Sequence, residues 1–147
     1  MSMKAKLKKL LSYSVKDWSL LVQAWSLLLA IDIGLRILPF RKVQGWIRPP
    51  HQKEKSELEA ERIIQRSSGF LDLAARHHLY PMTCLRRSLT LQWLLSRAGL
   101  YTTLQFGVRR ENGNLQAHAW LDYQGQVIDK NPIPTEQYAN LKAKEVA

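Results

Sequence analysis

The chain has 147 residues, enough for one domain with a buried core, and 46% of them are apolar. Its net charge of +10 indicates an acidic or anionic partner, but the basic residues are not interleaved with base-stacking aromatics and no nucleic-acid motif is present, so nucleic acid ranks last. A single cysteine cannot form an intramolecular disulfide, which favours a reducing, cytoplasmic setting.

Residues 1–50 are predicted to form a basic, amphipathic helical region, separate from a core at 51–147. Residues 1–48 hold nine lysines and arginines against two aspartates. Apolar residues recur every three or four positions from Leu7 to Leu29, which predicts one long helix or two, ending at Pro39.

Three roles for this region stay open: packing on the core or on a partner protein, adsorption to a membrane surface, and membrane spanning. Adsorption would use Trp18, Trp25 and the lysines. The uncharged stretch from Trp18 to Ile31 has 14 residues, fewer than the roughly 20 that a span needs, so spanning ranks last.

The next segment is predicted to be helical and charged, from Lys53 to Arg66, and its apolar pattern continues to Arg76. Ser67-Ser68-Gly69 is expected to interrupt it. His77 and His78 are adjacent and would point about 100° apart on a helix, so no metal site is predicted there. The polar tail beyond Pro134 is expected to be a short helix or a frayed end.

Cys84 is predicted to begin a helix. Thr83 is a good N-cap, and Leu85, Leu89 and Trp93 repeat at four-residue steps. Gly99 is expected to end the helix in the left-handed conformation. The free N–H groups at a helix start stabilise a thiolate and could bind a developing oxyanion. On position alone, a small buried hydrophobic residue is an equally good interpretation.

Three short strands follow, and they carry a histidine and a carboxylate. Alternation from Leu104 to Val108 predicts one strand, and Asn112-Gly113 predicts a hairpin turn into a second strand that contains His118. A two-residue turn at 124–125 would pair Trp120 with Asp129, which places Asp129 diagonally beside His118. Asp122 shares that face but lies about 13 Å along the strand, so Asp129 is the better orienting acid.

Four segments together resemble the lasso-peptide leader peptidases, a transglutaminase-like cysteine protease family. The similarity covers roughly residues 66–131 and lies in Cys84–Gly99, Gly107–Arg109, Ala117–Leu121 and Gly125–Ile128. The helix that ends Leu38-Pro39-Phe40-Arg41 is similar to that family's N-terminal region.

The resemblance implies an α+β fold with a papain/transglutaminase-like core, in which the nucleophile helix packs on a small antiparallel sheet beside an N-terminal helical region. It implies that Cys84 is the nucleophile, His118 the general base and then acid, and Asp129 the orienting acid, with no metal or cofactor. The activity implied is removal of the leader from a ribosomally made precursor during lasso peptide maturation.

The resemblance also implies partners. The chain looks like the standalone peptidase form, which acts with a separate winged-helix leader-recognition protein and a lasso cyclase. Two alternatives use the same fold: a non-catalytic peptide-binding or partner-binding module, and an acyl transferase of transglutaminase type, which differs in what its pocket admits.

Overall fold

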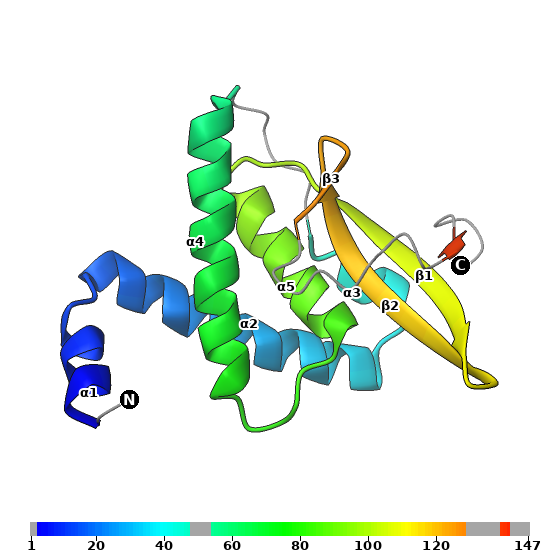
Figure 1. Cartoon of the computed structure of the whole chain (residues 1–147), viewed down its shortest axis with the longest axis horizontal. Coiled ribbons are helices and arrows are strands. Elements are labelled where there is room, and N and C mark those ends of the chain that lie inside the picture. Colours follow the sequence, from blue (N-terminus) through cyan, green and yellow to red (C-terminus); the bar gives the residue numbers. More distant parts are fainter. Residues whose placement is uncertain (1–2, 48–53, 129–138, 142–147) are drawn as a thin grey trace.

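The computed structural model describes residues 3–47, 54–128 and 139–141 and has the expected α+β architecture (Figure 1). The helices are α1 (Met3–Leu11), α2 (Val15–Ile37), α3 (Phe40–Gln44), α4 (Glu57–Arg76) and α5 (Cys84–Arg97). The strands are β1 (Thr103–Glu111), β2 (Asn114–Tyr123), β3 (Gln126–Val127) and β4 (Ala139–Leu141).

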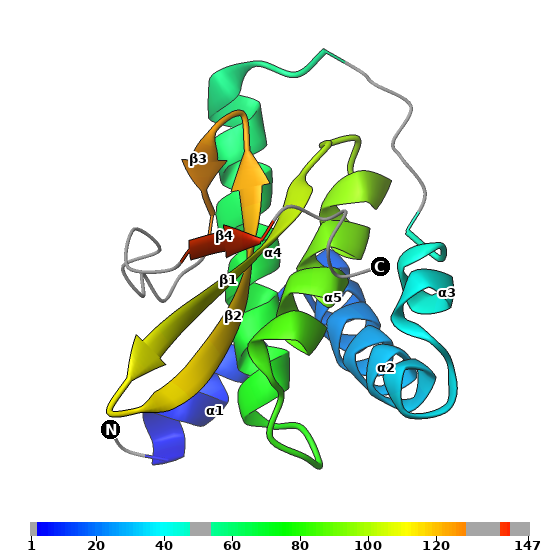
Figure 2. The same cartoon turned by 90° about the vertical axis from the view of Figure 1, so that its right-hand side faces the viewer.

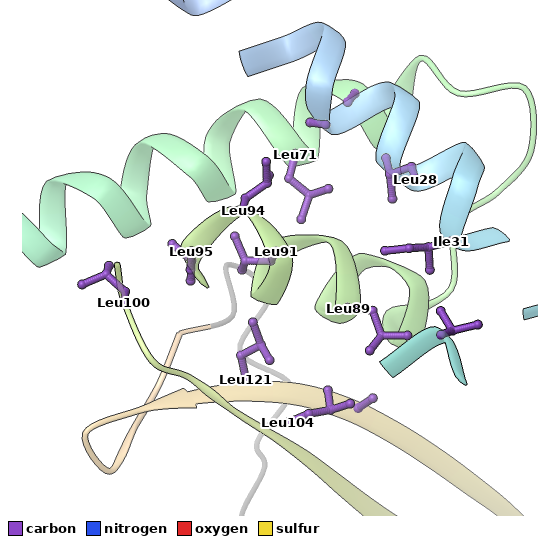
Figure 3. Packing of buried hydrophobic residues seen from close by; sticks show 14 of the residues in the cluster. Leu28, Ile31, Leu71, Leu89, Leu91, Leu94, Leu95, Leu100, Leu104 and Leu121 are labelled. Atoms are coloured by element: carbon purple, nitrogen blue, oxygen red, sulfur yellow. The ribbon is translucent and has the colours of Figure 1, made fainter. Parts of the chain in front are cut away.

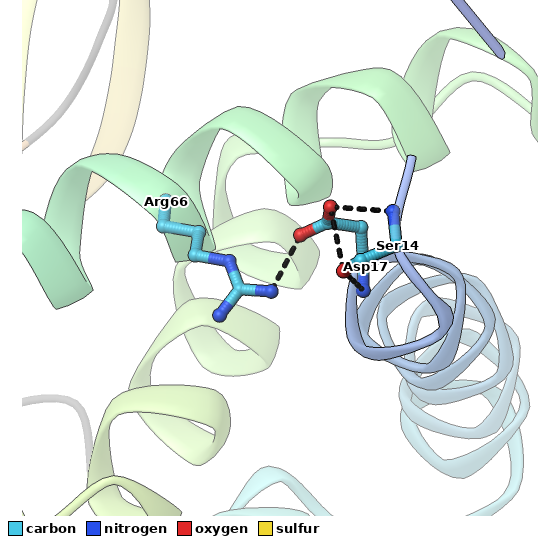
Figure 4. Close-up of polar contacts among 3 residues, drawn as sticks. All are labelled: Ser14, Asp17 and Arg66. Atoms are coloured by element: carbon cyan, nitrogen blue, oxygen red, sulfur yellow. Dashed lines mark hydrogen bonds and ion pairs between the residues drawn. The ribbon is translucent and has the colours of Figure 1, made fainter. Parts of the chain in front are cut away.

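Up to Pro39, the N-terminal region forms two helices, α1 and α2, which is the second of the two predicted arrangements. Ser14 separates them and begins α2 with a capping box, in which its side chain accepts from the backbone N–H of Asp17 and Asp17 accepts from Ser14 in return. Arg66 of α4 donates to the same carboxylate, which ties the start of α2 to α4 (Figure 4). Leu38, extended before Pro39, ends α2.

Helix α4 is continuous, so the predicted interruption at Ser67-Ser68-Gly69 is wrong. The helix also begins later than expected, at Glu57, with Ser56 as its N-cap. Ser67 and Ser68 are buried within the helix, where tertiary packing outweighs the weak helix propensity of a Ser-Ser-Gly sequence.

The turns follow the predicted chemistry. Gly99 adopts φ 87°, and the N–H of Leu100 bonds to the carbonyl of Leu95, so α5 ends in a left-handed cap. Asn112 and Gly113 have φ of 51° and 80°, and the strands on either side pair from Glu111↔Asn114 onward. These angles are those of a two-residue hairpin turn.

The described strands form one antiparallel sheet in the order β3-β2-β1-β4 (Figure 2). β4 pairs with β1 in the register Phe106↔Leu141 and Val108↔Ala139. The prediction of a helix or frayed end beyond Pro134 is therefore wrong at 139–141, where the backbone completes the sheet.

One hydrophobic core joins the helices to one face of the sheet. Leu28 of α2, Leu89 and Leu95 of α5 and Leu121 of β2 are almost fully buried (Figure 3). The core thus draws on α2 and on the segment after residue 50, across the expected boundary between the two regions.

Helix α2 has 23 residues and, by length and composition alone, could cross a membrane. The core helix of a soluble protein and a signal sequence have the same properties. Five of the α2 residues are buried in the fold, among them the carboxylate of Asp32.

Candidate active site

Cys84 is the first residue of α5, as predicted, and its thiol is free and half-buried. Thr83 precedes it in the extended conformation of an N-cap. Among the described residues, however, no side chain caps this helix, because the Thr83 hydroxyl accepts from Arg86 instead of from the backbone. The first-turn backbone N–H groups of α5 therefore remain available to donate hydrogen bonds to an anion beside the Cys84 thiol.

His118 lies in β2 and is buried, with 8% of its surface exposed. Its ring stacks on Trp120, with ring centroids 5.8 Å apart and planes 21° apart. Strand alternation places both rings on one face of β2, whereas Ala119 and Leu121 point from the other face into the core. Gly107 of β1 stands opposite His118.

A hydrogen bond joins the helix of Cys84 to the strand of His118. The Ser88 hydroxyl donates to the carbonyl of Ala119 at 3.2 Å. Ser88 follows Cys84 by one helical turn, about 6 Å along the axis, and Ala119 follows His118 directly. The structure therefore places the two candidate residues on elements that contact each other. The contact at Ser88 is one helical turn from Cys84, and the contact at Ala119 is next to His118.

The hydrogen bond from Ser88 to Ala119 lies at the edge of β2 that pairs with β3. The carbonyl of Leu121 accepts from Ile128 at that edge, and the carbonyl of Ala119, two residues back, points the same way. His118 shares the face of Trp120, whereas Ala119 and Leu121 face the core residues of α5.

Asp129 lies outside the described residues, but the register on which its prediction depends is confirmed. Gln124 and Gly125 form the predicted two-residue turn, with φ of 52° and 82°, and Tyr123 pairs with Gln126. The pairing continues to the bond from Ile128 to Leu121, one residue before Asp129. Asp122, the weaker candidate, instead accepts from the Gly125 backbone within the turn at 2.8 Å.

Two arginines after the cysteine fix the start of α5 to two other helices. Arg86 forms an ion pair with Asp32 of α2 at 2.6 Å, and Arg87 forms one with Asp72 of α4 at 2.6 Å. Each aspartate holds a second arginine four residues on in its own helix, Arg36 and Arg76 respectively. The first turn of α5 is thus joined by ion pairs to both α2 and α4.

These ion pairs were not predicted from the sequence, although Asp32 offered a signal as a carboxylate within an apolar helix. Its side chain is only 4% exposed, and a buried charge requires a partner. At Asp72, burial raises the pKa, but the hydrogen bonds and charges of Arg87 and Arg76 lower it by more, so the pKa lies below its usual 3.8.

His77 and His78 contact Trp25 of α2. The indole Nε1 of Trp25 donates to the carbonyl of His77 at 3.4 Å, and its ring lies 4.8 Å from the ring of His78. Within the described ranges, no three His, Cys, Asp or Glu side chains group as metal ligands.

Comparison with known proteins identifies the family. A model of the transglutaminase-like superfamily matches residues 26–143, which cover most of the chain and include the later part of α2, both candidate residues and the four described strands. No curated protein and no solved structure matches the chain. The family match spans well over half of the sequence, and the chain therefore belongs to the transglutaminase-like superfamily, which includes cysteine peptidases and acyl transferases.

Proposed function

We propose that the protein is a cysteine peptidase that removes the leader from a ribosomally synthesised precursor during lasso peptide maturation. The observation that carries this proposal is the packing of α5, which begins at Cys84, on β2 beside His118 through the Ser88–Ala119 bond. The sequence resemblance supplies the substrate class, a separate winged-helix leader-binding protein and a lasso cyclase as partners.

In the proposed mechanism, the Cys84 thiolate attacks the carbonyl carbon of the amide at the leader–core junction. First-turn N–H groups of α5 would bind the oxyanion, for which the absence of a side-chain cap among the described residues is favourable. The C–N bond breaks as His118 protonates the leaving amine, and water activated by the same imidazole then releases the acyl group. Asp129 would orient the imidazole.

Acyl transfer of transglutaminase type uses the same thiol, but the thioester forms from a glutamine side-chain amide with loss of ammonia, and an amine replaces water in the second step, so the assay must separate the two. The purified chain is incubated with precursor and leader-binding protein, and products are identified by mass spectrometry in the presence and absence of a primary amine. Free leader is expected. A precursor that keeps its leader and gains the amine would instead assign the chain as a transferase.

Two variant pairs test the residues. Cys84→Ala and His118→Ala should each reduce cleavage by about a thousandfold or more. Asp129→Asn should reduce cleavage strongly. Asp122→Asn should leave cleavage near the wild-type rate, because the side-chain carbonyl of the asparagine can still accept from the Gly125 N–H. Undiminished cleavage by Cys84→Ala would exclude the thiol mechanism, and equal losses in both aspartate variants would exclude the assigned orienting acid.

A further inference from the structure

Among the described residues, the three most exposed large apolar side chains lie on α1 and at the start of α2. Helix α1 has no buried residue. Met3, Leu11 and Val15 are 86%, 80% and 87% exposed. An isolated nine-residue helix is marginal in water, so a surface that covers its apolar face would stabilise it.

These side chains follow one another at helical spacing on each of the two helices. Met3, Leu7 and Leu11 are four residues apart and share one face of α1. Val15, Trp18 and Val22 follow at helical spacing on α2 and are all exposed. We refer to these six residues as the elbow stripe.

The surroundings of the elbow stripe are basic. Lysines stand at positions 4, 6, 8, 9 and 16, and α1 contains no acidic residue. The neighbouring carboxylate, Asp17, is occupied by hydrogen bonds from Ser14 and by Arg66, so it does not neutralise these lysines (Figure 4). An apolar face flanked by lysines is complementary to an anionic lipid surface.

An apolar groove that includes Trp18 and Val22 of the stripe suggests another occupant, a partner helix. It has a volume of about 400 Å³ between α1, α2 and the end of α4, with Leu10, Trp25 and Leu73 among its walls. A helix in this groove would leave Met3, Leu11 and Val15 in water, because they do not line it. A lipid surface is not confined to the groove, and α1 lying on it would place Met3, Leu7 and Leu11 against the lipid.

We propose that the elbow stripe binds an anionic membrane surface, with α1 lying in the interface. Figure 1 shows α1 at the end of the molecule opposite the β1–β2 hairpin, so the catalytic elements would face away from the lipid. Helix α2 does not have to leave the core, since Leu28 and Ile31 stay buried while Val15 and Val22 are exposed. The proposal does not depend on the peptidase activity.

Vesicle sedimentation of the full chain tests this directly. Vesicles of phosphatidylglycerol and phosphatidylcholine in equal parts should bind the protein at least about tenfold more tightly than vesicles of phosphatidylcholine alone. Binding should weaken in about 0.5 M NaCl, where charge attraction is screened. Equal binding to both vesicle types, or binding to neither, would overturn the proposal.

Matched variants locate the contact. Leu7→Gln with Leu11→Gln should reduce vesicle binding about tenfold or more, and since α1 is not buried, the fold and its unfolding midpoint should not change. Leu115→Gln, at an equally exposed position in β2, should bind as wild type. Vesicle binding that survives in the double variant rejects the elbow stripe. Loss of self-association or of precursor binding in that variant, without vesicle binding by wild type, assigns the stripe to a protein partner instead.

Discussion

At the scale of single residues, two serines of α5 show how one hydroxyl can join two elements. Ser88 is buried and donates to Ala119 in β2, whereas Ser96 donates to Trp93 within its own helix. Changing either serine to alanine removes the same group, a hydroxyl. Only the change at Ser88 leaves a carbonyl of another element without its donor.

Ser88→Ala is therefore expected to lower the free energy of unfolding by about 1–2 kcal/mol, measured by urea denaturation. Ser96→Ala should be close to neutral, because the gain in helix propensity offsets a local bond. If Cys84 and His118 act together, Ser88→Ala should also lower the cleavage rate more than Ser96→Ala does. Equal stability of the two variants would show that the inter-element bond is unimportant.

At the scale of elements, the helix ends and strand turns that the sequence predicted correctly are those determined by adjacent residues. Thr83 marked the start of α5, Gly99 its end, and the Asn112-Gly113 and Gln124-Gly125 turns fixed the register of β2 with its neighbours. Each of these depends on the conformational preference of one or two adjacent residues.

The features that the sequence did not reveal depend on distant partners. The unbroken α4 is stabilised by packing of Ser67 and Ser68, and β4 forms by pairing with β1, more than 30 residues earlier. The ion pair of Arg86 with Asp32 joins two helices that no local pattern relates. Periodicity shows that a helix has a buried face, but it does not show which element covers that face.

The ion pair between α4 and α5 gives a prediction for pH. The guanidinium groups of Arg87 and Arg76 overcome burial and hold the pKa of Asp72 below its usual 3.8. A carboxyl with a lowered folded-state pKa stabilises the fold above its unfolded pKa, and this contribution is lost as pH falls through the folded pKa.

Asp72→Asn should therefore be less stable than wild type by about 1–2 kcal/mol at neutral pH, and this difference should shrink below about pH 4. Urea denaturation of both proteins across the acid range measures it. The pKa of Asp17 is lowered too, by its Ser14 hydrogen bonds and Arg66, but Asp17 is present in both proteins and cancels in the difference. A difference that stays constant down to pH 3 would contradict this role for Asp72.

At the scale of the whole molecule, the two N-terminal helices make different contributions. Helix α1 has no buried residue, while α2 supplies Leu28 and Ile31 to the core and Asp32 to Arg86. The family match begins at residue 26, within α2. The part of the chain that carries Cys84 and His118 therefore shares its stability with α2 and not with α1.

Two deletions measure this division by circular dichroism and urea denaturation. Removing residues 1–11 should change the free energy of unfolding by less than about 1 kcal/mol, because no buried side chain is lost. Removing residues 1–38 should abolish cooperative unfolding. Leu28 and Ile31 alone contribute about 3–6 kcal/mol of burial, against a total stability of about 5–15 kcal/mol for an ordinary domain. Arg86 would also lose its buried partner, Asp32. A cooperative transition in the shorter chain would instead mean that α5 and the sheet fold without α2.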